Sequence, residues 1–467
     1  MKKWQKNQII GLAVAALLII GSIFYTPEGI ESGLWRSIIL TCSFMLVLIS
    51  NGLPTILLSL LCIGIMPLLK VTDTFANSFS GFSNQAVYFV MMSFGLAAVL
   101  METSFCKRIL NWMFQHIGKN VEGLILAIMI CTALTSAFIS DVPTCVLYLA
   151  FGESILEIYS DEQQKKRAGK AIMIAISMAS MIGGIATPVG STVNILASNI
   201  LESTLGKSIN FVQWMSICVP MVVIMIPVCW KFIVWIFKPS PISEQDRVKF
   251  VESFAQKEKL TGKEIRTLFI FLIMLGFWFA SSWVQNISTM HVMFLGVCIM
   301  AIPGIGVTTI DKIVKEIKFD ILVLIATIIT LCNAMMNQGF GEWLLSFVPK
   351  IQIPMLVFIV AVMLCIYILI LIVPIAPSLT MVVVPVVIMI AQQIGVNPMM
   401  MIPICSISIG CGYLLPMDSV FLMTYGKGYY SIKDFTKVSI CILLTAIVLS
   451  VTVVYGIMHL WGLTQIG

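Results

Sequence analysis

Long apolar segments alternate with short polar ones along almost the whole chain, and this pattern predicts a helical membrane protein. Most of these segments run for roughly 17–25 residues, the length at which an α-helix crosses the hydrocarbon core of a bilayer. We predict about eleven such spans, over residues 8–25, 34–50, 52–70, 84–103, 169–201, 210–237, 264–283, 290–308, 319–337, 398–424 and 437–461. The predicted fold class is an all-α integral membrane protein.

Two further apolar stretches, residues 121–158 and 351–395, are interrupted near the middle. The first interruption reads Ser-Asp-Val-Pro-Thr over residues 140–144, and the second reads Pro-Ile-Ala-Pro-Ser-Leu-Thr over residues 374–380. A break in the helix at membrane depth is tolerated only where it lines a protein cavity. We therefore interpret both stretches as re-entrant hairpins, each of which enters and leaves the membrane on one side.

The distribution of Lys and Arg favours this topology. With a cytoplasmic N-terminus, the basic residues gather in the segments predicted to be cytoplasmic, whereas the predicted outer loops contain few of them. The asymmetry is lost if either hairpin is drawn as a full span. The pattern predicts a multi-pass plasma-membrane protein whose C-terminus lies outside.

The polar segments also divide the chain into two similar halves. After a first transmembrane helix within residues 1–33, we predict one repeat at residues 34–238, a cytoplasmic linker at 239–263 and a second repeat at 264–467. Each repeat contains ordinary spans, a short amphipathic segment, a hairpin and a broken helix. An odd number of spans per repeat inverts the second relative to the first, and inverted repeats with matching broken helices are typical of secondary transporters.

The first broken helix, within residues 169–201, has an unusual composition at its centre. Residues 181–194 read MIGGIATPVGSTVN, and Pro188 aligns with Pro416 of the second broken helix at residues 398–424. Unwound backbone exposes carbonyl oxygens that suit Na⁺, and the N-termini of half-helices suit an anion. Small residues also serve close helix packing, which is the alternative explanation. Since both halves carry a hairpin tip and a break, we favour a joint cation and anion site.

At these residues the sequence resembles the divalent anion:sodium symporter family, which carries dicarboxylates, citrate or sulfate. The family's break reads roughly GG-x-x-T-P-x-G-T-P-P-N, and residues 183–194 read GGIATPVGSTVN. The resemblance implies Na⁺-coupled symport of a small divalent anion. It also implies a homodimer in which a domain containing the hairpins and the broken helices slides against a scaffold, an elevator-type movement.

The resemblance and the residues together give the candidate site. The candidate ligands of the first sodium ion are Ser136, Ser140, Asp141, Gly190 and Asn194. The candidate substrate-binding residues are Ser140, Asp141, Val142, Ser191, Ser378 and Ser419. Thr380 and Asp418 would form a second cation site.

The chain departs from the family pattern at both hairpin tips. Asp141-Val142 replace the family's Asn-Thr at the first tip, and the second tip reads Ile-Ala-Pro at residues 375–377. Asp418 stands where the first repeat has Gly190. An Asp at bilayer depth needs a compensating partner, so each acid is either a helix cap or part of a cation site. The acids keep a proton-coupled organic-acid or oxyanion permease, or a cation/proton antiporter, as the alternative.

Composition and motifs argue against other classes of function. Hydrophobic residues make up 59% of the chain and charged ones 11%, far below the roughly 25% charged residues of soluble domains. The 13 cysteines form no CxxC pair, and the 3 histidines form no HExxH motif, so an enzyme has no support. Scattered basic residues argue against nucleic acid, and no phosphate-binding loop suggests an organic cofactor. Paired hairpins favour a carrier over an ion channel. The expected coupling ion is Na⁺ or H⁺.

Overall fold

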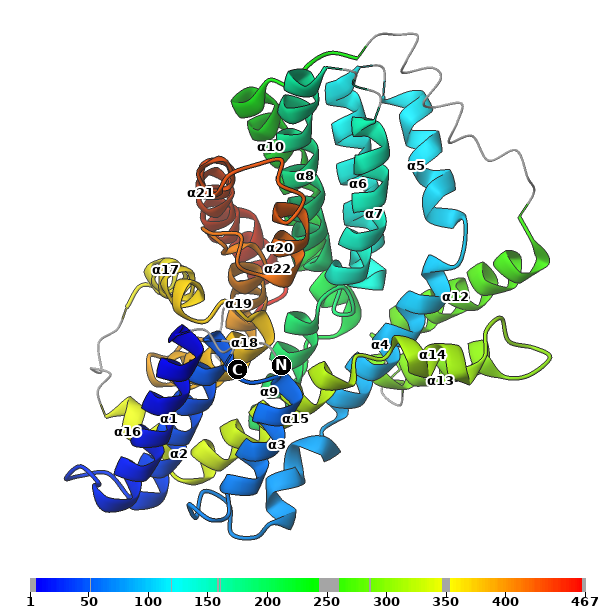
Figure 1. Cartoon of the computed structure of the whole chain (residues 1–467). Helices are drawn as coiled ribbons and strands as arrows, with labels where there is room; N and C mark the ends of the chain where they lie inside the picture. Colours follow the sequence, from blue (N-terminus) through cyan, green and yellow to red (C-terminus); the bar gives the residue numbers. More distant parts are fainter. Residues whose placement is uncertain are drawn as a thin grey trace.

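The computed structural model is a bundle of helices joined by short connections (Figure 1). It describes residues 6–463 apart from 51, 119, 158, 160, 243–259, 285–286 and 347–352, and this described part contains no β-strand. Its first half consists of α1 (Lys6–Phe24), α2 (Ser32–Ile49), α3 (Thr55–Ile65), η1 (Ala76–Ser83), α4 (Gln85–Met101), α5 (Phe105–His116), α6 (Val121–Ile139), α7 (Asp141–Leu156), α8 (Glu162–Gly184), α9 (Thr192–Leu205) and α10 (Phe211–Phe237).

The second half likewise contains long helices, two consecutive helices joined by a short turn, and an interrupted helix. It consists of α12 (Gly262–Ala280), α13 (Thr289–Ala301), α14 (Ile310–Glu316), α15 (Phe319–Asn337), α16 (Phe340–Leu345), α17 (Met355–Ile372), α18 (Ala376–Gln393), α19 (Pro398–Cys411), α20 (Ser419–Tyr425), α21 (Ile432–Leu449), η2 (Ser450–Val454) and α22 (Tyr455–Leu460). Most of the predicted linker lies outside the described residues.

The lengths and hydropathy of the helices agree with a membrane protein. Among the described residues, 7 helices are long and apolar enough to cross a bilayer, or up to 8 if the bent pair η1 and α4 is one span. The shorter apolar helices α1, α3, α13 and α19 coincide with further predicted spans. The all-α membrane class is confirmed, and the number of spans stays a prediction.

Two predicted spans are shorter in the structure because of proline. The helix predicted over residues 52–70 ends at Ile65, just before Pro67, and the helix predicted over 290–308 ends at Ala301, just before Pro303. Proline lacks the amide donor of the helix and disfavours helical geometry in the residue before it. The apolar run therefore continues beyond the helix in both places.

Helices α6 and α7 form a hairpin, and a hydrogen bond joins each of its outer ends to α10 or to the segment that follows α10. Near its start, the indole nitrogen of Trp230 in α10 donates to the carbonyl of Glu122 at 2.9 Å. Beyond its end, the Tyr159 hydroxyl donates to the carbonyl of Ser240 at 2.7 Å. One end therefore contacts α10 and the other contacts the segment just after α10. That the hairpin is re-entrant stays a prediction. Figure 1 shows α6, α7 and α8 side by side.

Both predicted broken helices are broken in the structure. The first is interrupted between Gly184, the end of α8, and Thr192, the start of α9. The second is interrupted between Cys411, the end of α19, and Ser419, the start of α20. Each gap contains the aligned proline, which cannot complete the helical hydrogen-bond ladder.

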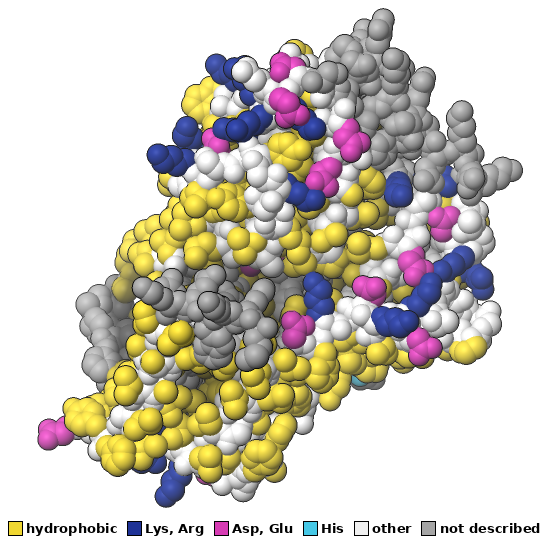
Figure 2. Space-filling model, in the orientation of Figure 1, with side chains coloured by type: hydrophobic (Ala, Val, Ile, Leu, Met, Phe, Trp, Pro, Cys, Tyr) yellow, Lys and Arg dark blue, Asp and Glu magenta, His cyan; other side chains and the backbone are white. Residues whose placement is uncertain are grey.

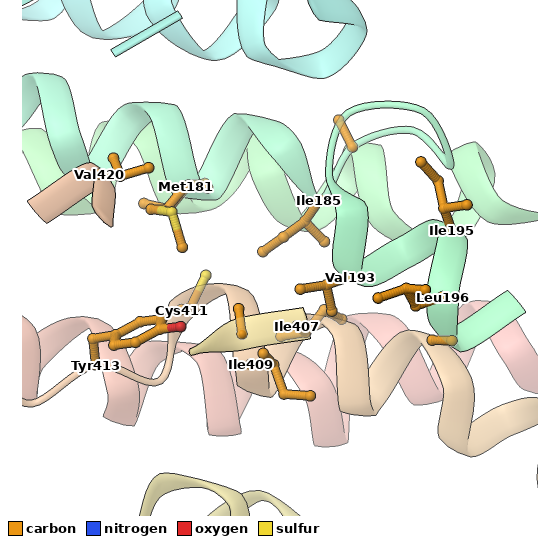
Figure 3. Close-up of a cluster of buried hydrophobic side chains, with 14 of the residues drawn as sticks. Met181, Ile185, Val193, Ile195, Leu196, Ile407, Ile409, Cys411, Tyr413 and Val420 are labelled. Carbon is orange, nitrogen blue, oxygen red and sulfur yellow. The ribbon is translucent and has the colours of Figure 1, made fainter. Parts of the chain in front are cut away.

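The two halves interlock at these breaks. Helix α9 packs against α18 of the second hairpin, and α20 packs against α7 of the first. An apolar cluster lies where the end of α8 and the start of α9 meet α19, and in it Ile185 and Val193 lie opposite Ile407 and Cys411 (Figure 3). A Cβ added at Gly410 would lie 3.1 Å from Cγ1 of Ile185, so the two broken helices cross at close range. The reciprocal packing is what inverted repeats would produce, and the repeat boundaries themselves stay a prediction.

Ion pairs join segments that the predicted topology places in the cytoplasm. Glu102 accepts from Lys263 at 2.7 Å and from Lys312 at 3.3 Å. Lys427 pairs with Glu153 at 2.7 Å, and Lys170 pairs with Asp434 at 2.9 Å. Figure 2 shows charged side chains gathered over the upper and right parts of one face, with hydrophobic side chains over much of the rest.

Cysteine labelling tests the predicted topology. In a cysteine-free background, a cysteine placed near Glu244, which lies outside the described residues, is expected to react with a membrane-impermeant thiol reagent only after the cells are opened. A cysteine at Ser288, at the opposite end of α12, is expected to react in intact cells. Labelling near Glu244 from outside would contradict the inside N-terminus and the cytoplasmic linker.

Candidate functional site

The tip of the first hairpin is a single strained residue. Ser140 has φ 89° and ψ 154°, a conformation that is nearly restricted to glycine and costs of order 1–3 kcal/mol. Two hydrogen bonds to α8 stabilise it: Ser136 Oγ donates to the carbonyl of Ser180 at 2.6 Å, and Ser180 Oγ donates to the carbonyl of Asp141 at 2.6 Å. The tip is therefore fixed beside the first break.

Carbonyl oxygens converge on Gly190 within that break. A Cβ added to Gly190 would lie 2.6 Å from the carbonyl oxygen of Gly184, 2.9 Å from that of Ala137 and 3.0 Å from that of Ser136. We call these three oxygens the carbonyl cradle. Because two of these oxygens come from α6 of the hairpin and one from the end of α8, and all three surround Gly190 within the break, the cradle exists only when these segments pack together.

The side chain of Asn194 connects the two sides of the break. Its amide nitrogen donates to the carbonyl of Gly184 and to that of Thr187, both at 2.8 Å. The hydroxyl of Thr187 in turn donates to the carbonyl of Ala137. The amide oxygen of Asn194 is buried and has no hydrogen-bond partner among the described residues. Asn194 thus stabilises the cradle and retains an oxygen for a ligand.

Asp141 joins the hairpin tip to the start of α9. Its Oδ1 accepts from the amide of Val142 at 2.8 Å and from Ser140 Oγ at 3.1 Å. Its Oδ2 accepts from Ser191 Oγ at 3.2 Å, and the same hydroxyl caps α9 by accepting from the amide of Val193. The structure therefore brings together four of the predicted substrate-binding residues.

Asp418 caps α20 in the second break. Its Oδ1 accepts from the amide of Val420 at 3.0 Å and from Ser419 Oγ at 3.3 Å, and its Oδ2 accepts from the hydroxyl of Tyr413 at 3.3 Å. Asp418 therefore acts as a helix cap, which is one of the two roles that the sequence predicts for it, the other being part of a cation site. Nothing in the sequence pattern pointed to Tyr413.

The two acids converge, although the sequence assigned them to separate cation sites. Cys145 Sγ donates to the carbonyl of Val420 at 3.7 Å, so the starts of α7 and α20 are adjacent. Asp141 and Asp418 are close enough to interact electrostatically. Within the described part of the chain, the ion pairs with Lys or Arg involve neither acid. The site therefore holds two carboxylates without a basic partner there.

The remaining candidates of the second repeat are less directly connected. Thr380 Oγ1 donates to the carbonyl of Ala376 at 2.8 Å, within its own helix. Ser378 Oγ is buried without a hydrogen-bond partner in the described structure. No hydrogen bond between described residues joins either side chain to Asp418, so the proposed second cation site is not assembled as the first one is.

The chemistry of the first site suits a hard cation. Its ligands are carbonyl, hydroxyl and carboxylate oxygens, which prefer ions such as Na⁺ over transition metals. Among the described residues, no group of three or more His, Cys, Asp or Glu could hold a metal ion. The cradle, Asp141 and the free oxygen of Asn194 therefore form a candidate cation site.

Comparison with known proteins gives matches along nearly the whole chain. Residues 4–464 match the family described as the sodium:sulfate symporter transmembrane region. The sodium-dependent dicarboxylate transporter SdcS of Staphylococcus saprophyticus is 22% identical over 482 residues, which cover 97% of this chain and 92% of that protein. SdcS of Staphylococcus aureus strain MSSA476 is 21% identical over 487 residues, covering 98% and 92%.

Solved structures share the fold. The structure of MtrF from Neisseria gonorrhoeae, which belongs to a class of antimetabolite efflux pumps, matches with a TM-score of 0.57 and 11% identity over 96% of this chain and 95% of that one. The YdaH transporter of Alcanivorax borkumensis matches with a TM-score of 0.50 and 11% identity, over 99% and 100% of the two chains. At this identity the likeness concerns the fold alone.

Proposed function

Because the chain belongs to the sodium:sulfate symporter family, and is thus a sodium-coupled secondary transporter and not an enzyme, we propose that it carries a divalent anion together with Na⁺. The substrate class would be a C4-dicarboxylate, citrate or sulfate. The observation that carries the proposal is the carbonyl cradle at Gly190 with Asp141 hydrogen-bonded beside it.

The order of binding follows from charge. Two carboxylates without a basic partner repel an anion, and the repulsion is strong where water is scarce. Na⁺ in the cradle offsets the charge of Asp141. The hydroxyls of Ser140 and Ser191 and the N-terminus of α9 then offer hydrogen-bond donors to the anion. Coupling arises because the anion binds well only after the cation.

The movement that we propose is an elevator-type displacement in a homodimer. The two hairpins and the two broken helices pack mainly on one another: α6 and α7 on α8, α18 on α9 and α19, and α20 on α7 and α8. Elements that form their own core can move as one body against the rest. Helices α2, α3 and α15, together with η1, pack on one another and would belong to the scaffold.

Proton coupling is the second candidate, and one observation favours it. Asp141 and Asp418 lie within electrostatic reach of each other and lack a basic partner among the described residues. A proton bound to either acid removes the repulsion between the two, as a bound sodium ion would offset it. A permease or antiporter of the same architecture would use the acids in this way.

Ligand binding to the purified protein tests the proposal. A ligand that binds only the folded state raises the melting temperature. We expect Na⁺ to stabilise the full-length protein, and one anion among succinate, citrate, sulfate and phosphate to stabilise it further only when Na⁺ is present. Stabilisation by an anion equally in Na⁺ and in K⁺ would contradict sodium-coupled binding.

A further inference from the structure

A cavity of about 410 Å³ lies at the end of the helix bundle that the predicted topology places outside. It is enclosed by the start of α4, the break before α9, α9 itself, the start of α10 and the segment between α12 and α13. These elements come from both the predicted mobile domain and its surroundings. The cavity therefore lies where the two parts meet.

The cavity borders the break in which the candidate cation site lies. Pro188 lines it, and Pro188 lies between Thr187, whose carbonyl Asn194 binds, and Gly190 of the cradle. Ile195, Ser198 and Glu202 of α9 also line the cavity. The cavity thus reaches the break at Pro188, two residues before Gly190 of the cradle.

The polar lining of the cavity is rich in oxygen and carries one acid. It includes the hydroxyls of Ser208 and Ser288 and the amides of Gln85 and Asn199. Glu202 is the acidic side chain, and no Lys or Arg is among the described residues of the wall. Such a cavity concentrates hydrated cations and disfavours free anions, because a cleft focuses the field of the charge within it.

Gln85 holds this carboxylate in place over the cavity. Its amide nitrogen donates to Oε2 of Glu202 at 3.1 Å and to Oδ1 of Asn199 at 3.0 Å. The contact joins α4 to α9 and leaves the charge of Glu202 uncompensated. A neutral donor that positions an acid without cancelling its charge is what a cation-attracting site needs.

We infer that this cavity is the outer port through which the coupling cation reaches the cradle, and that Glu202 attracts the cation there. The inference rests on the proposed sodium coupling. It adds the route by which the cation enters and the residue that attracts it. Glu202 is exposed, so its substitution does not disturb the packing of α9. It acts at a distance from the cradle and is a positioning residue for the cation.

The test measures the rate of radioactive sodium uptake by whole cells expressing the full chain at a series of external Na⁺ concentrations. Glu202→Gln should raise the half-saturating external Na⁺ concentration about two- to fivefold, the effect of one solvent-accessible charge, with an unchanged maximal rate. The shift should shrink at high ionic strength. The matched control is Glu31→Gln, an exposed acid predicted on the same side but away from the cavity, which should leave the value unchanged.

Chemical modification separates the charge from the shape of the side chain. In a background lacking other reactive cysteines, the thiol of a Glu202→Cys variant is modified with negatively or positively charged methanethiosulfonate reagents of similar size. The negatively charged adduct should return the half-saturating Na⁺ concentration to that of the unmodified chain. The positively charged adduct should raise it further. The proposed role of the cavity and of Glu202 would be wrong if both adducts had equal effects, or if Glu202→Gln left the half-saturating Na⁺ concentration unchanged. Either result would leave the proposed sodium coupling intact. Radioactive sodium uptake by cells expressing the unmodified chain that does not exceed the uptake of cells without it would overturn both.

Discussion

Replacing Gly190 with valine is expected to abolish transport while the protein still reaches the membrane. The added Cβ would lie 2.6 Å from the carbonyl oxygen of Gly184 and 2.9 Å from that of Ala137. Both are backbone atoms, so the cradle has to open to make room. Overpacking typically destabilises the folded state by about 1–3 kcal/mol, and a large helical core tolerates this loss. The spacing of the carbonyl oxygens, however, is no longer suited to the cation.

Transport and folding are measured separately for this variant. Uptake in proteoliposomes should fall to background, whereas expression and elution as a single species should be retained. Gly276→Val is the matched control, because a Cβ at Gly276 of α12 meets no atom within 4 Å. If Gly190→Val transports with normal rate and sodium dependence, residues 183–194 are a packing feature and the cation binds elsewhere.

Changing Asp141 to asparagine is expected to weaken the dependence of transport on the cation. Asparagine has nearly the same shape: its Oδ1 can still accept from the amide of Val142, and its amide nitrogen, which replaces Oδ2, can donate to the hydroxyl of Ser191, so the hairpin tip stays in place. The negative charge is lost. Interactions with charged groups contribute about 1.5–3 kcal/mol, so the half-saturating Na⁺ concentration should rise by about tenfold or more.

The control for this variant is an aspartate that only caps a helix. Asp161 accepts from the amide of Gln163 at 3.0 Å at the exposed start of α8, and Asp161→Asn should not change the cation dependence. A change in the pH dependence of Asp141→Asn, with Na⁺ dependence intact, would support proton coupling instead. If neither dependence changes, Asp141 serves only as a cap and contributes no charge to coupling.

The breaks and the hairpin tips could be predicted because their signals are local. Glycine and proline interrupt an apolar run at residues 183–190, and the structure is unwound between Gly184 and Thr192. Ser140 marks the first tip in both the sequence and the structure. The ends of α3 and α13 were extended wrongly because hydropathy continues past Pro67 and Pro303.

The convergence of the two acids could not be predicted from the sequence. It depends on the packing of α20 against α7, two helices far apart in the chain. Ser180, which donates to the carbonyl of Asp141, lies in a regular helix and carries no motif. The side chain of Asn199 in α9 accepts from Gln85 in α4. Such contacts arise from the tertiary fold alone.

Uptake of labelled succinate, citrate or sulfate into proteoliposomes under separate ion gradients tests the sodium-coupled anion symport most directly. We expect one of these anions to accumulate above equilibrium under an inward Na⁺ gradient, and not under an equal K⁺ gradient or a proton gradient alone. Accumulation driven by protons without Na⁺, or no accumulation of any of the three anions in Na⁺, would contradict it.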